Sequence, residues 1–465
     1  MAARQPRVFT GLTSKALHLT LFPKGRSRAK PASPLIMAYG FAGMIAVGTV
    51  LLLLPFATES GRSAGVLTAL FTATSAVCVT GLVLVDTGTY WSPFGQAVIL
   101  VLIQLGGLGF MTSATLLLLF LGRRVTLRER ILIGEAMGSE PTPGGMVRLV
   151  QRIVLLTLAI EGAGAVYLTW RFSAYAGVTS LWQGVFHAVS AFNNAGFGLR
   201  PDSLVAYQRD ASTLLAIAVL VVLGGISYTL LADVARFRRF RRLTVDSRIV
   251  LVSTGVLLAA GTIFVLIAEA GNPATLGPLS WPYKILNALF QSVVPRTAGF
   301  NSLNYASLMQ ATLFFSMILM FIGAASGSTG GGIKINTVGV LVASTWSTLR
   351  GRPHPEAFKH ELMEEQLRRA LLLVALGLGV VFVAGFALSL VDNHSFVDQL
   401  FEAFSAFGTV GLSVGITPTL SALGQLLIIV TMFVGRLGPL TLALSLTQHR
   451  QIVRYRYAQE AVKIG

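Results

Sequence analysis

Long hydrophobic stretches separated by short polar segments dominate the chain. A helix needs about 20 apolar residues to cross a hydrocarbon core roughly 30 Å thick, and eight stretches come close to or exceed that length. They lie at Leu35–Ala57, Gly95–Leu121, Ile153–Thr169, Thr213–Ala235, Ile249–Ala268, Ala311–Val342, Ala370–Val391 and Leu423–Leu446. The pattern predicts an all-α membrane protein with eight transmembrane helices.

Composition supports this class. Hydrophobic residues make up 54% of the 465 residues and charged residues only 12%, about half of the quarter typical of soluble proteins. The mean hydropathy is +0.71. The single cysteine, Cys78, excludes an internal disulfide and a cysteine-rich metal site.

The basic residues predict the orientation of the chain. The net charge of +17 is concentrated in the two tails and in the linkers after the second, fourth and sixth stretches, whereas the other connections hold few bases and several acids. Short basic connections are typical of the cytoplasmic side of a membrane, so both termini are expected there. This distribution accounts for the charge without a nucleic-acid partner.

A repeated motif occupies the four connections on the outer side. It reads LFTATSAVCVTGL from Leu70, VFHAVSAFNNAGF from Val185, LFQSVVPRTAGF from Leu289 and LFEAFSAFGTVGL from Leu400. The third copy has one residue fewer between its phenylalanine and its closing glycine. A recurring unit of span, half-helix, glycine loop and span indicates a four-fold internal repeat. The predicted organisation is a basic tail at 1–33, repeats at 34–122, 150–243, 247–350 and 366–449, and a tail at 450–465.

Irregular backbone at membrane depth is tolerated only where it is buried in protein or lines a water-filled cavity. Four such loops around one pseudo-four-fold axis would present backbone carbonyls that replace the water shell of a cation, and glycine permits the backbone angles needed. Packing of glycines between helices is the alternative, which four glycines at nearly the same offset make improbable. The candidate filter residues are Cys78, Val79, Thr80, Gly81, Asn193, Asn194, Ala195, Gly196, Thr297, Ala298, Gly299, Thr409, Val410 and Gly411.

The sixth hydrophobic stretch contains a glycine-rich interruption, GAASGSTGGG from Gly323. Each glycine lowers helix propensity by roughly 1 kcal/mol relative to alanine, so an unbroken helix is not expected. The segment is either a loop that blocks the pore below the filter or a kink for close packing. It is not a phosphate-binding loop, because Ile333 stands where that motif requires lysine. The candidate gate residues are Gly323, Gly327, Ser328, Thr329, Gly330, Gly331, Gly332, Lys334 and Arg436.

Several charged residues fall within the predicted spans. Arg436 lies in the middle of the eighth stretch, too far from its end to reach the headgroups, so it is expected to face the pore or a buried partner. It could oppose cation passage or tie loop carbonyls together. Glu161 could serve in hydrogen bonding between helices or in function, and Arg296 is expected to brace the third loop.

The segments SAVCVTGL, SAFNNAGFGL, PRTAGFNSL and SAFGTVGL, with GIKINT and GRLGP further on, resemble the Trk/Ktr/HKT superfamily of potassium transporters, and most closely its KtrB-type membrane subunits. The resemblance extends over nearly the whole chain from Pro34. It implies potassium uptake across the inner membrane of a bacterium, an intramembrane gating loop and a matching arginine beside that loop. It further implies a homodimer and a cytosolic ring of RCK-type (KtrA-type) subunits, which would carry the nucleotide in place of this chain.

Other functions remain to be weighed. A sodium-permeable member of the same superfamily would share these motifs, and sodium could also be coupled to transport. A secondary transporter of a small solute predicts discontinuous spans at matched positions in two halves, whereas the sequence indicates one broken span. An enzyme is not expected, because the six histidines are scattered along the chain.

Overall fold

The computed structural model describes residues 35–109, 145–176, 179–237 and 239–438. The chain divides into two units, Met1–Ala32 and Ser33–Gly465, and the described residues all belong to the second. The predicted tails at 1–33 and 450–465 lie outside the described residues, as do the end of the second hydrophobic stretch and the basic linker that follows it, up to residue 144.

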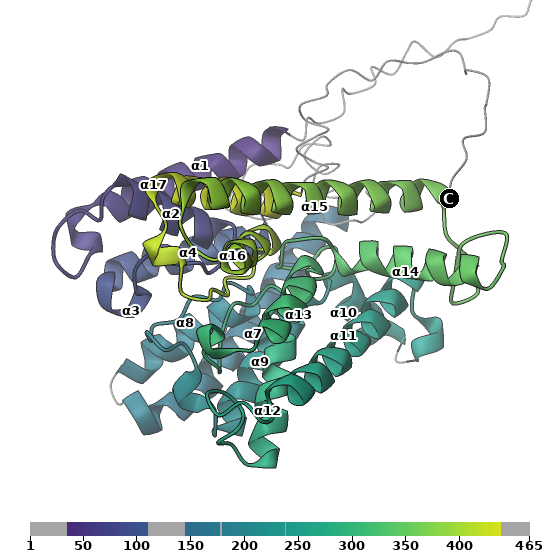
Figure 1. Cartoon of the computed structure of the whole chain (residues 1–465), viewed down its shortest axis with the longest axis horizontal. Coiled ribbons are helices and arrows are strands. Elements are labelled where there is room, and N and C mark those ends of the chain that lie inside the picture. Colours follow the sequence, from purple (N-terminus) through teal and green to yellow (C-terminus); the bar gives the residue numbers. More distant parts are fainter. Residues whose placement is uncertain (1–34, 110–144, 177–178, 238, 439–465) are drawn as a thin grey trace, which may run out of the picture. The chain divides into compact units, whose positions relative to one another are not determined.

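Helices account for nearly all regular structure in the described part of the chain (Figure 1). The first predicted repeat contains α1 (Leu35–Leu53), η1 (Pro55–Ala57), α2 (Val66–Val77), α3 (Thr87–Tyr90) and α4 (Pro93–Leu108). The second contains α7 (Gly145–Ala176), α8 (Ser180–Phe192), η3 (Val205–Tyr207), α9 (Ala211–Gly225), α10 (Tyr228–Phe237) and η4 (Phe240–Arg242). The third contains α11 (Val245–Glu269), α12 (Trp281–Val293), η5 (Tyr305–Ser307), α13 (Gln310–Phe321) and α14 (Ile335–Leu349). The fourth contains α15 (Glu364–Val391), α16 (Phe396–Gly408), η6 (Thr417–Thr419) and α17 (Ala422–Leu437).

A small antiparallel hairpin joins the third and fourth sets of helices. Its strands are β1 (Glu356–Ala357) and β2 (His360–Glu361), with Ala357 opposite His360.

Among the described residues, three helices are long and apolar enough to cross a membrane. They are α11, α15 and the part of α7 from Val150 to Ala174. The pair α9 and α10 would make a fourth if it counted as one span. The other expected spans are represented by shorter apolar helices, partly because the sixth stretch is divided between α13 and α14 and the description of the second and eighth stops early.

The sequence predicted one straight span at 213–235, and this is wrong. Helix α9 ends at Gly225, α10 begins at Tyr228, and the two axes differ by 97°. The Gly224–Gly225 pair weakens the helix, and the Ser227 hydroxyl accepts a hydrogen bond from the Leu230 amide at 3.1 Å, which caps the new helix. The chain therefore has a second interrupted stretch besides the glycine-rich one.

Arg436, predicted in the middle of the eighth stretch, lies near the end of the described part of that stretch. Helix α17 ends at Leu437, and Gly438 follows with a φ of 84°, so Arg436 lies in the last helical turn. Glycine terminates helices because it adopts this left-handed conformation readily. The arginine consequently sits beside the negative end of the helix dipole, which favours a cation.

Polar side chains cap three of the helices that follow the glycine loops. Ser92 accepts from the Gly95 amide at the start of α4, Asp210 from the Thr213 amide at α9, and Ser421 from the Gly424 amide at α17. Each cap satisfies one amide that the first helical turn leaves free, so it fixes where the helix begins.

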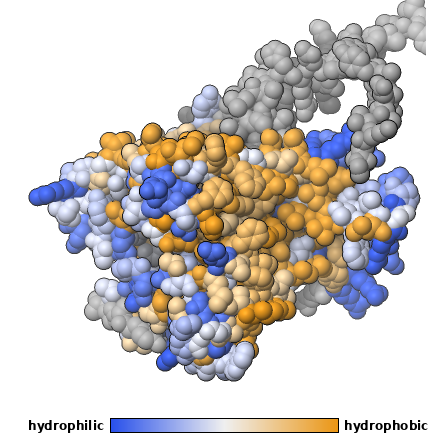
Figure 2. Space-filling view, in the orientation of Figure 1, coloured by the Kyte–Doolittle hydropathy of each residue, from blue (hydrophilic) through white to orange (hydrophobic). Residues whose placement is uncertain are grey.

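The interior and the surface are both apolar. The phenylalanines shared by the four motifs are at most 1% exposed: Phe71, Phe186, Phe290 and Phe401. Outward-facing Leu371, Phe382 and Leu390 of α15 are more than half exposed. Figure 2 shows hydrophobic side chains over α15 and its neighbours, with hydrophilic residues to the left and right of them. Such a surface fits a lipid environment.

Candidate ion-binding site

The four glycine loops share one backbone pattern. Two residues before each closing glycine stands a residue with positive φ: Val79 (57°), Asn194 (58°), Thr297 (79°) and Thr409 (51°). The closing glycines are also in this region: Gly81 (90°), Gly196 (71°), Gly299 (72°) and Gly411 (89°). Positive φ is uncommon outside glycine and gathers where a function requires a special backbone.

The loops meet in a closed ring. A Cβ atom on the glycine of one loop would collide with backbone of another: Gly81 with the oxygen of Ala195 (2.4 Å), Gly196 with the Cα of Gly299 (2.9 Å), Gly299 with the oxygen of Val410 (2.3 Å), and Gly411 with the oxygen of Thr80 (2.2 Å). Contacts therefore run from the first loop through the second, third and fourth and back to the first. Only glycine fits at these four positions.

Buried carbonyl groups are concentrated in this ring. The residue before each closing glycine is fully buried: Thr80, Ala195, Ala298 and Val410. Within the described part of the chain, no protein group donates a hydrogen bond to any of their four carbonyl oxygens. Four buried carbonyl oxygens gathered in one ring form a set of ligands suited to a cation.

Serines in the half-helices hold three of the loops. The Ser75 and Ser405 hydroxyls accept from the amides of Gly81 (3.0 Å) and Gly411 (3.1 Å), and the Ser190 hydroxyl donates to the Phe197 oxygen (2.7 Å). In the third loop, which is one residue shorter, Ser292 instead donates to the Leu258 oxygen of α11 at 2.9 Å. In the third repeat the serine therefore ties the half-helix α12 to α11 rather than to its own loop.

The glycine-rich segment is a folded loop between α13 and α14. Its two ends pair, since the Gly323 amide donates to the Ile333 oxygen at 2.8 Å and the Ile335 amide donates to the Ala324 oxygen at 3.2 Å. Residues Ile322–Lys334 connect α13 to α14 and contain most of the candidate gate residues, and they are called the gating loop below.

Three successive residues of the gating loop contact three of the positive-φ residues. Thr329 Oγ1 lies 3.0 Å from the side-chain amide of Asn194, and the Gly331 amide donates to Thr409 Oγ1 at 3.1 Å. Between them, a Cβ on Gly330 would lie 2.3 Å from Thr297 Oγ1. The loop therefore packs against the ring on the side of these residues.

Two basic side chains form hydrogen bonds with carbonyl groups of the gating loop. Arg436 donates to the Thr329 oxygen and to the Gly106 oxygen at the end of α4, and Lys334 donates to the Gly330 oxygen. Arg436 thereby connects the first and fourth repeats to the loop. Both expected roles of this arginine, as a charge barrier and as a tie between carbonyls, are compatible with these contacts.

Other predicted residues lie behind the loops. Glu161 accepts from Asn193 Nδ2 at 2.8 Å, and the same nitrogen lies 3.0 Å from Gln104 Oε1. Arg296 is 8% exposed and donates to Thr254 Oγ1 at 3.3 Å. Cys78 is a buried free thiol.

Two buried acids were missed by the sequence analysis. Glu402 of α16 accepts from Thr417 Oγ1 and from the Ser413 hydroxyl beyond the fourth loop. Glu269 accepts from Asn272, Thr275 and the Met309 amide, which joins the end of α11 to the start of α13. The acid in LFEAF, followed by the hydroxyl-bearing SVGIT, was the available signal for the first.

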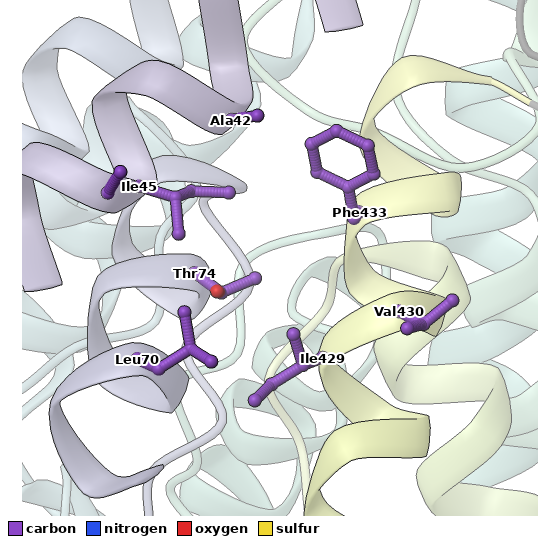
Figure 3. Close-up of a pocket in the computed structure, with 8 residues that line it drawn as sticks. Ala42, Ile45, Leu70, Thr74, Ile429, Val430 and Phe433 are labelled. Carbon is purple, nitrogen blue, oxygen red and sulfur yellow. The ribbon is translucent and has the colours of Figure 1, made fainter. Parts of the chain in front are cut away.

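Away from the ring, an apolar cavity of about 270 Å³ lies between α1, α2 and α17 (Figure 3). Ile45, Leu70, Ile429 and Phe433 are among the residues that line it. It offers almost no polar atoms, so it is not an ion site. No group of three or more histidine, cysteine or acidic side chains that could bind a metal occurs among the described residues.

The proteins of known sequence that this chain is similar to are described as transport or uptake proteins for cations. A family profile named TrkH, described as a cation transport protein, matches residues 26–452. The chain is 44% identical to the Ktr system potassium uptake protein B of Bacillus subtilis over 424 residues, covering 91% of this chain and 95% of that protein. It is 37% identical to the potassium/sodium uptake protein NtpJ of Enterococcus hirae, covering 95% and 99%.

The fold is similar to the crystal structure of the potassium transporter TrkH from Vibrio parahaemolyticus. The TM-score is 0.71 at 18% identity, covering 91% of this chain and 87% of that one. At this identity the likeness shows the fold alone.

Proposed function

Because the chain belongs to the TrkH family of cation transport proteins and is of the KtrB type within it, we propose that it conducts potassium through the ring of glycine loops. The observation that carries this proposal is the set of four buried, unpaired carbonyls at Thr80, Ala195, Ala298 and Val410. A dehydrated cation needs oxygens in place of its water, and these carbonyls supply them without any carboxylate.

The filter then consists of the residues from Cys78 to Gly81, Asn193 to Gly196, Thr297 to Gly299 and Thr409 to Gly411. The half-helices α2, α8, α12 and α16 each end at the beginning of a loop. Their negative dipole ends favour a cation in the ring. The absence of a Cβ at each closing glycine keeps the loops close enough to share one ion.

The gating loop closes the path below this ring. Thr329, Gly330 and Gly331 contact Asn194, Thr409 and Thr297 of the filter loops, and Arg436 and Lys334 place two positive charges beside them. A cation leaving the filter would meet both the backbone of the loop and this charge. Conduction therefore requires the loop to withdraw.

Potassium is favoured as the main ion because two similar proteins are named for potassium uptake, and one of these names also includes sodium. The filter is tested with the variant Gly81→Ser, whose Cβ would press on the Ala195 oxygen and disturb one quarter of the ring. Uptake of potassium and sodium isotopes into vesicles should show a lower potassium preference. An unchanged ratio of the two ions in a folded variant would contradict the carbonyl filter.

Sodium could also be a coupling ion. The interruption between α9 and α10 adds a second broken stretch to that between α13 and α14, so discontinuous helices no longer argue against a coupled transporter of a small solute. Potassium uptake measured with and without a sodium gradient distinguishes a channel-like mechanism from a sodium-coupled one. Flux through a channel-like filter persists without the gradient, whereas coupled uptake stops.

The assembly proposed for this subunit has eight spans in four repeats, both termini in the cytoplasm and a location in the bacterial inner membrane. Two copies form a homodimer, and a cytosolic RCK-type ring supplies nucleotide control, in keeping with relatives named as parts of a Ktr system. Nucleotide shifts the gate only by binding the open and closed states with different affinity. Reconstitution with the candidate ring and ATP or ADP tests this: absence of both ring binding and nucleotide-dependent flux would refute it.

A further inference from the structure

Helix α10 leaves the line of α9 at the cytoplasmic end proposed for this span. The two helices differ by 97°, so if α9 crosses the bilayer, α10 lies close to the plane of the membrane surface. The Ser227 cap makes this turn a built feature of the chain. A helix in this position faces lipid headgroups.

The segment at the end of α10 carries a cluster of arginines. Exposed members among the described residues are Arg236, Arg239, Arg241 and Arg242. No described carboxylate lies within 4.0 Å of their side chains. The nearby Asp233 instead accepts from Thr244 Oγ1 at 2.8 Å and Ser247 Oγ at 2.7 Å. The cluster therefore presents unneutralised positive charge.

Apolar side chains accompany these charges. Val234 is 44% exposed and Phe240 is 46% exposed, and the Phe240 ring packs edge-on against Phe358 of the hairpin at 6.0 Å. Exposed apolar groups beside a dense basic cluster are typical of segments that bind anionic lipid surfaces. A nucleic acid or acidic protein would use the charges but not the apolar groups.

The same helix is packed against the gating loop. Leu230 is 1% exposed and belongs to a small core with Val250 of α11, Ala325 of the gating loop and Ile335, the first residue of α14. The Ala325 amide also donates to the Gly225 oxygen at the end of α9, at 3.0 Å. A displacement of α10 would therefore reach the loop through direct contacts.

We propose that Arg239, Arg241 and Arg242 bind the phosphate headgroups of anionic phospholipids, and that α10 transmits this binding to the gating loop. The inference rests on the orientation and gate given under the proposed function. An anionic headgroup supplies the missing counter-charge, while Val234 and Phe240 enter the interfacial region. Anionic lipid then biases the gate to the extent that it binds one loop position better than the other.

The binding step is tested on the full chain in vesicles of phosphatidylcholine with and without phosphatidylglycerol. The variant Arg239→Gln/Arg241→Gln/Arg242→Gln should retain less phosphatidylglycerol after mild detergent extraction, measured by native mass spectrometry. Each arginine removed should weaken binding about fivefold, the factor that corresponds to about 1 kcal/mol per basic residue. The matched control is Arg368→Gln/Arg369→Gln, which removes exposed arginines paired with Glu364 and Glu365.

The coupling step is tested by potassium flux in the same vesicles. Wild-type flux should change severalfold with phosphatidylglycerol, and the triple variant should lose that dependence. Leu230→Val should keep phosphatidylglycerol retention but reduce its effect on flux, because it weakens the core that Leu230 shares with Ala325 and leaves the arginines in place.

Equal lipid retention by the triple variant and the wild type would overturn the proposal. Loss of binding to the cytosolic RCK-type ring by that variant would also overturn it and would reassign the surface to a protein. Retention with lipid-independent flux in the wild type would overturn the transmission step. Absence of any potassium flux in either vesicle would refute the proposed function, while the retention result would still decide lipid binding.

Discussion

The third repeat differs from the other three at one shared glycine. In the first, second and fourth repeats this glycine lies in the last turn of the helix that follows the filter loop. There it packs against the end of the half-helix of the same repeat: Gly106 on Val77, Gly224 on Phe192 and Gly435 on Phe407. In the third repeat, Gly323 lies instead against the Gly331 oxygen of the gating loop. The same close contact thus supports a half-helix three times and a loop once.

Under the proposed function, this difference explains how one of four similar units serves as a gate. In three repeats the helix directly buttresses the filter, so its glycine is part of the rigid frame. In the third, the gating loop occupies that place, and Ser292 ties the half-helix α12 to α11. Under that proposal, a movable part is inserted while the other three repeats keep their contacts.

The largest expected effect is a difference in stability and flux between alanine variants of Gly224 and Gly323. A Cβ on Gly224 would lie 1.7 Å from the Phe192 oxygen, within the frame, so Gly224→Ala should lower stability by about 1–3 kcal/mol and abolish flux. A Cβ on Gly323 would press on the Gly331 oxygen of the gating loop, which is proposed to move. Gly323→Ala should therefore raise potassium flux with less loss of stability. Thermal unfolding in detergent and isotope uptake measure both, and an equal response of the two variants would remove the distinction.

The next effect concerns Arg436 and the loop itself. Deletion within Gly323–Gly332, or Arg436→Ala, should raise flux severalfold, because the arginine loses its bonds to the Thr329 and Gly106 oxygens. Arg436→Lys keeps the charge but cannot bridge both oxygens with a guanidinium fork. Low flux in the lysine variant would identify a charge barrier, and high flux a structural tie. Wild-type flux in the alanine and deletion variants would place the barrier elsewhere.

A smaller effect is expected at Thr329. Its hydroxyl donates to the Gly224 oxygen at 3.0 Å and thereby joins the loop to the frame of the second repeat. Thr329→Val preserves the shape but loses about 1 kcal/mol of hydrogen bonding, so the open fraction should rise about fivefold. Single-channel or flux recordings provide the measurement, and Ser328→Ala, whose hydroxyl bonds only within the loop to the Ala325 oxygen, is the control.

The smallest effect lies at the outer ends of the second repeat, where Arg171 of α7 binds Asp210 at 2.9 Å. Burial raises the pKa of Asp210, but hydrogen bonds from Thr213, Arg171 and Ser212 outweigh it and lower the pKa to about 2. The stabilisation is therefore complete above about pH 4 and declines as the pH falls towards about 2. Melting temperatures of Asp210→Asn and the wild type should converge over this range, and parallel curves would contradict the assignment.

The sequence predicted the half-helices and the position of the glycine-rich break because both depend on local signals: glycine, hydrophobic periodicity and repetition. The bend at Ile226 was missed since Gly224–Gly225 resembles ordinary packing glycines within an apolar stretch.

Contacts between distant segments were beyond the sequence. Nothing local indicates that Thr329 meets Asn194, or that Glu269 joins α11 to α13. The motif did predict which residues form the loops, but the closed order of their contacts, from Gly81 to Ala195 and finally from Gly411 to Thr80, depends on the packing of all four repeats.

The hydrogen bonds that hold the gating loop have a consequence for the ion itself. The loop occupies the carbonyl oxygens of Gly224 and Gly225 through Thr329 and Ala325, and Arg436 occupies that of Gly106. If the loop withdraws as proposed, the Gly224 and Gly225 oxygens lose these donors in the region where a cation would emerge from the filter. The permeating ion can take over as their partner and thus stabilise the open path. Potassium would then act as an agonist of its own passage, and the open fraction should increase with its concentration.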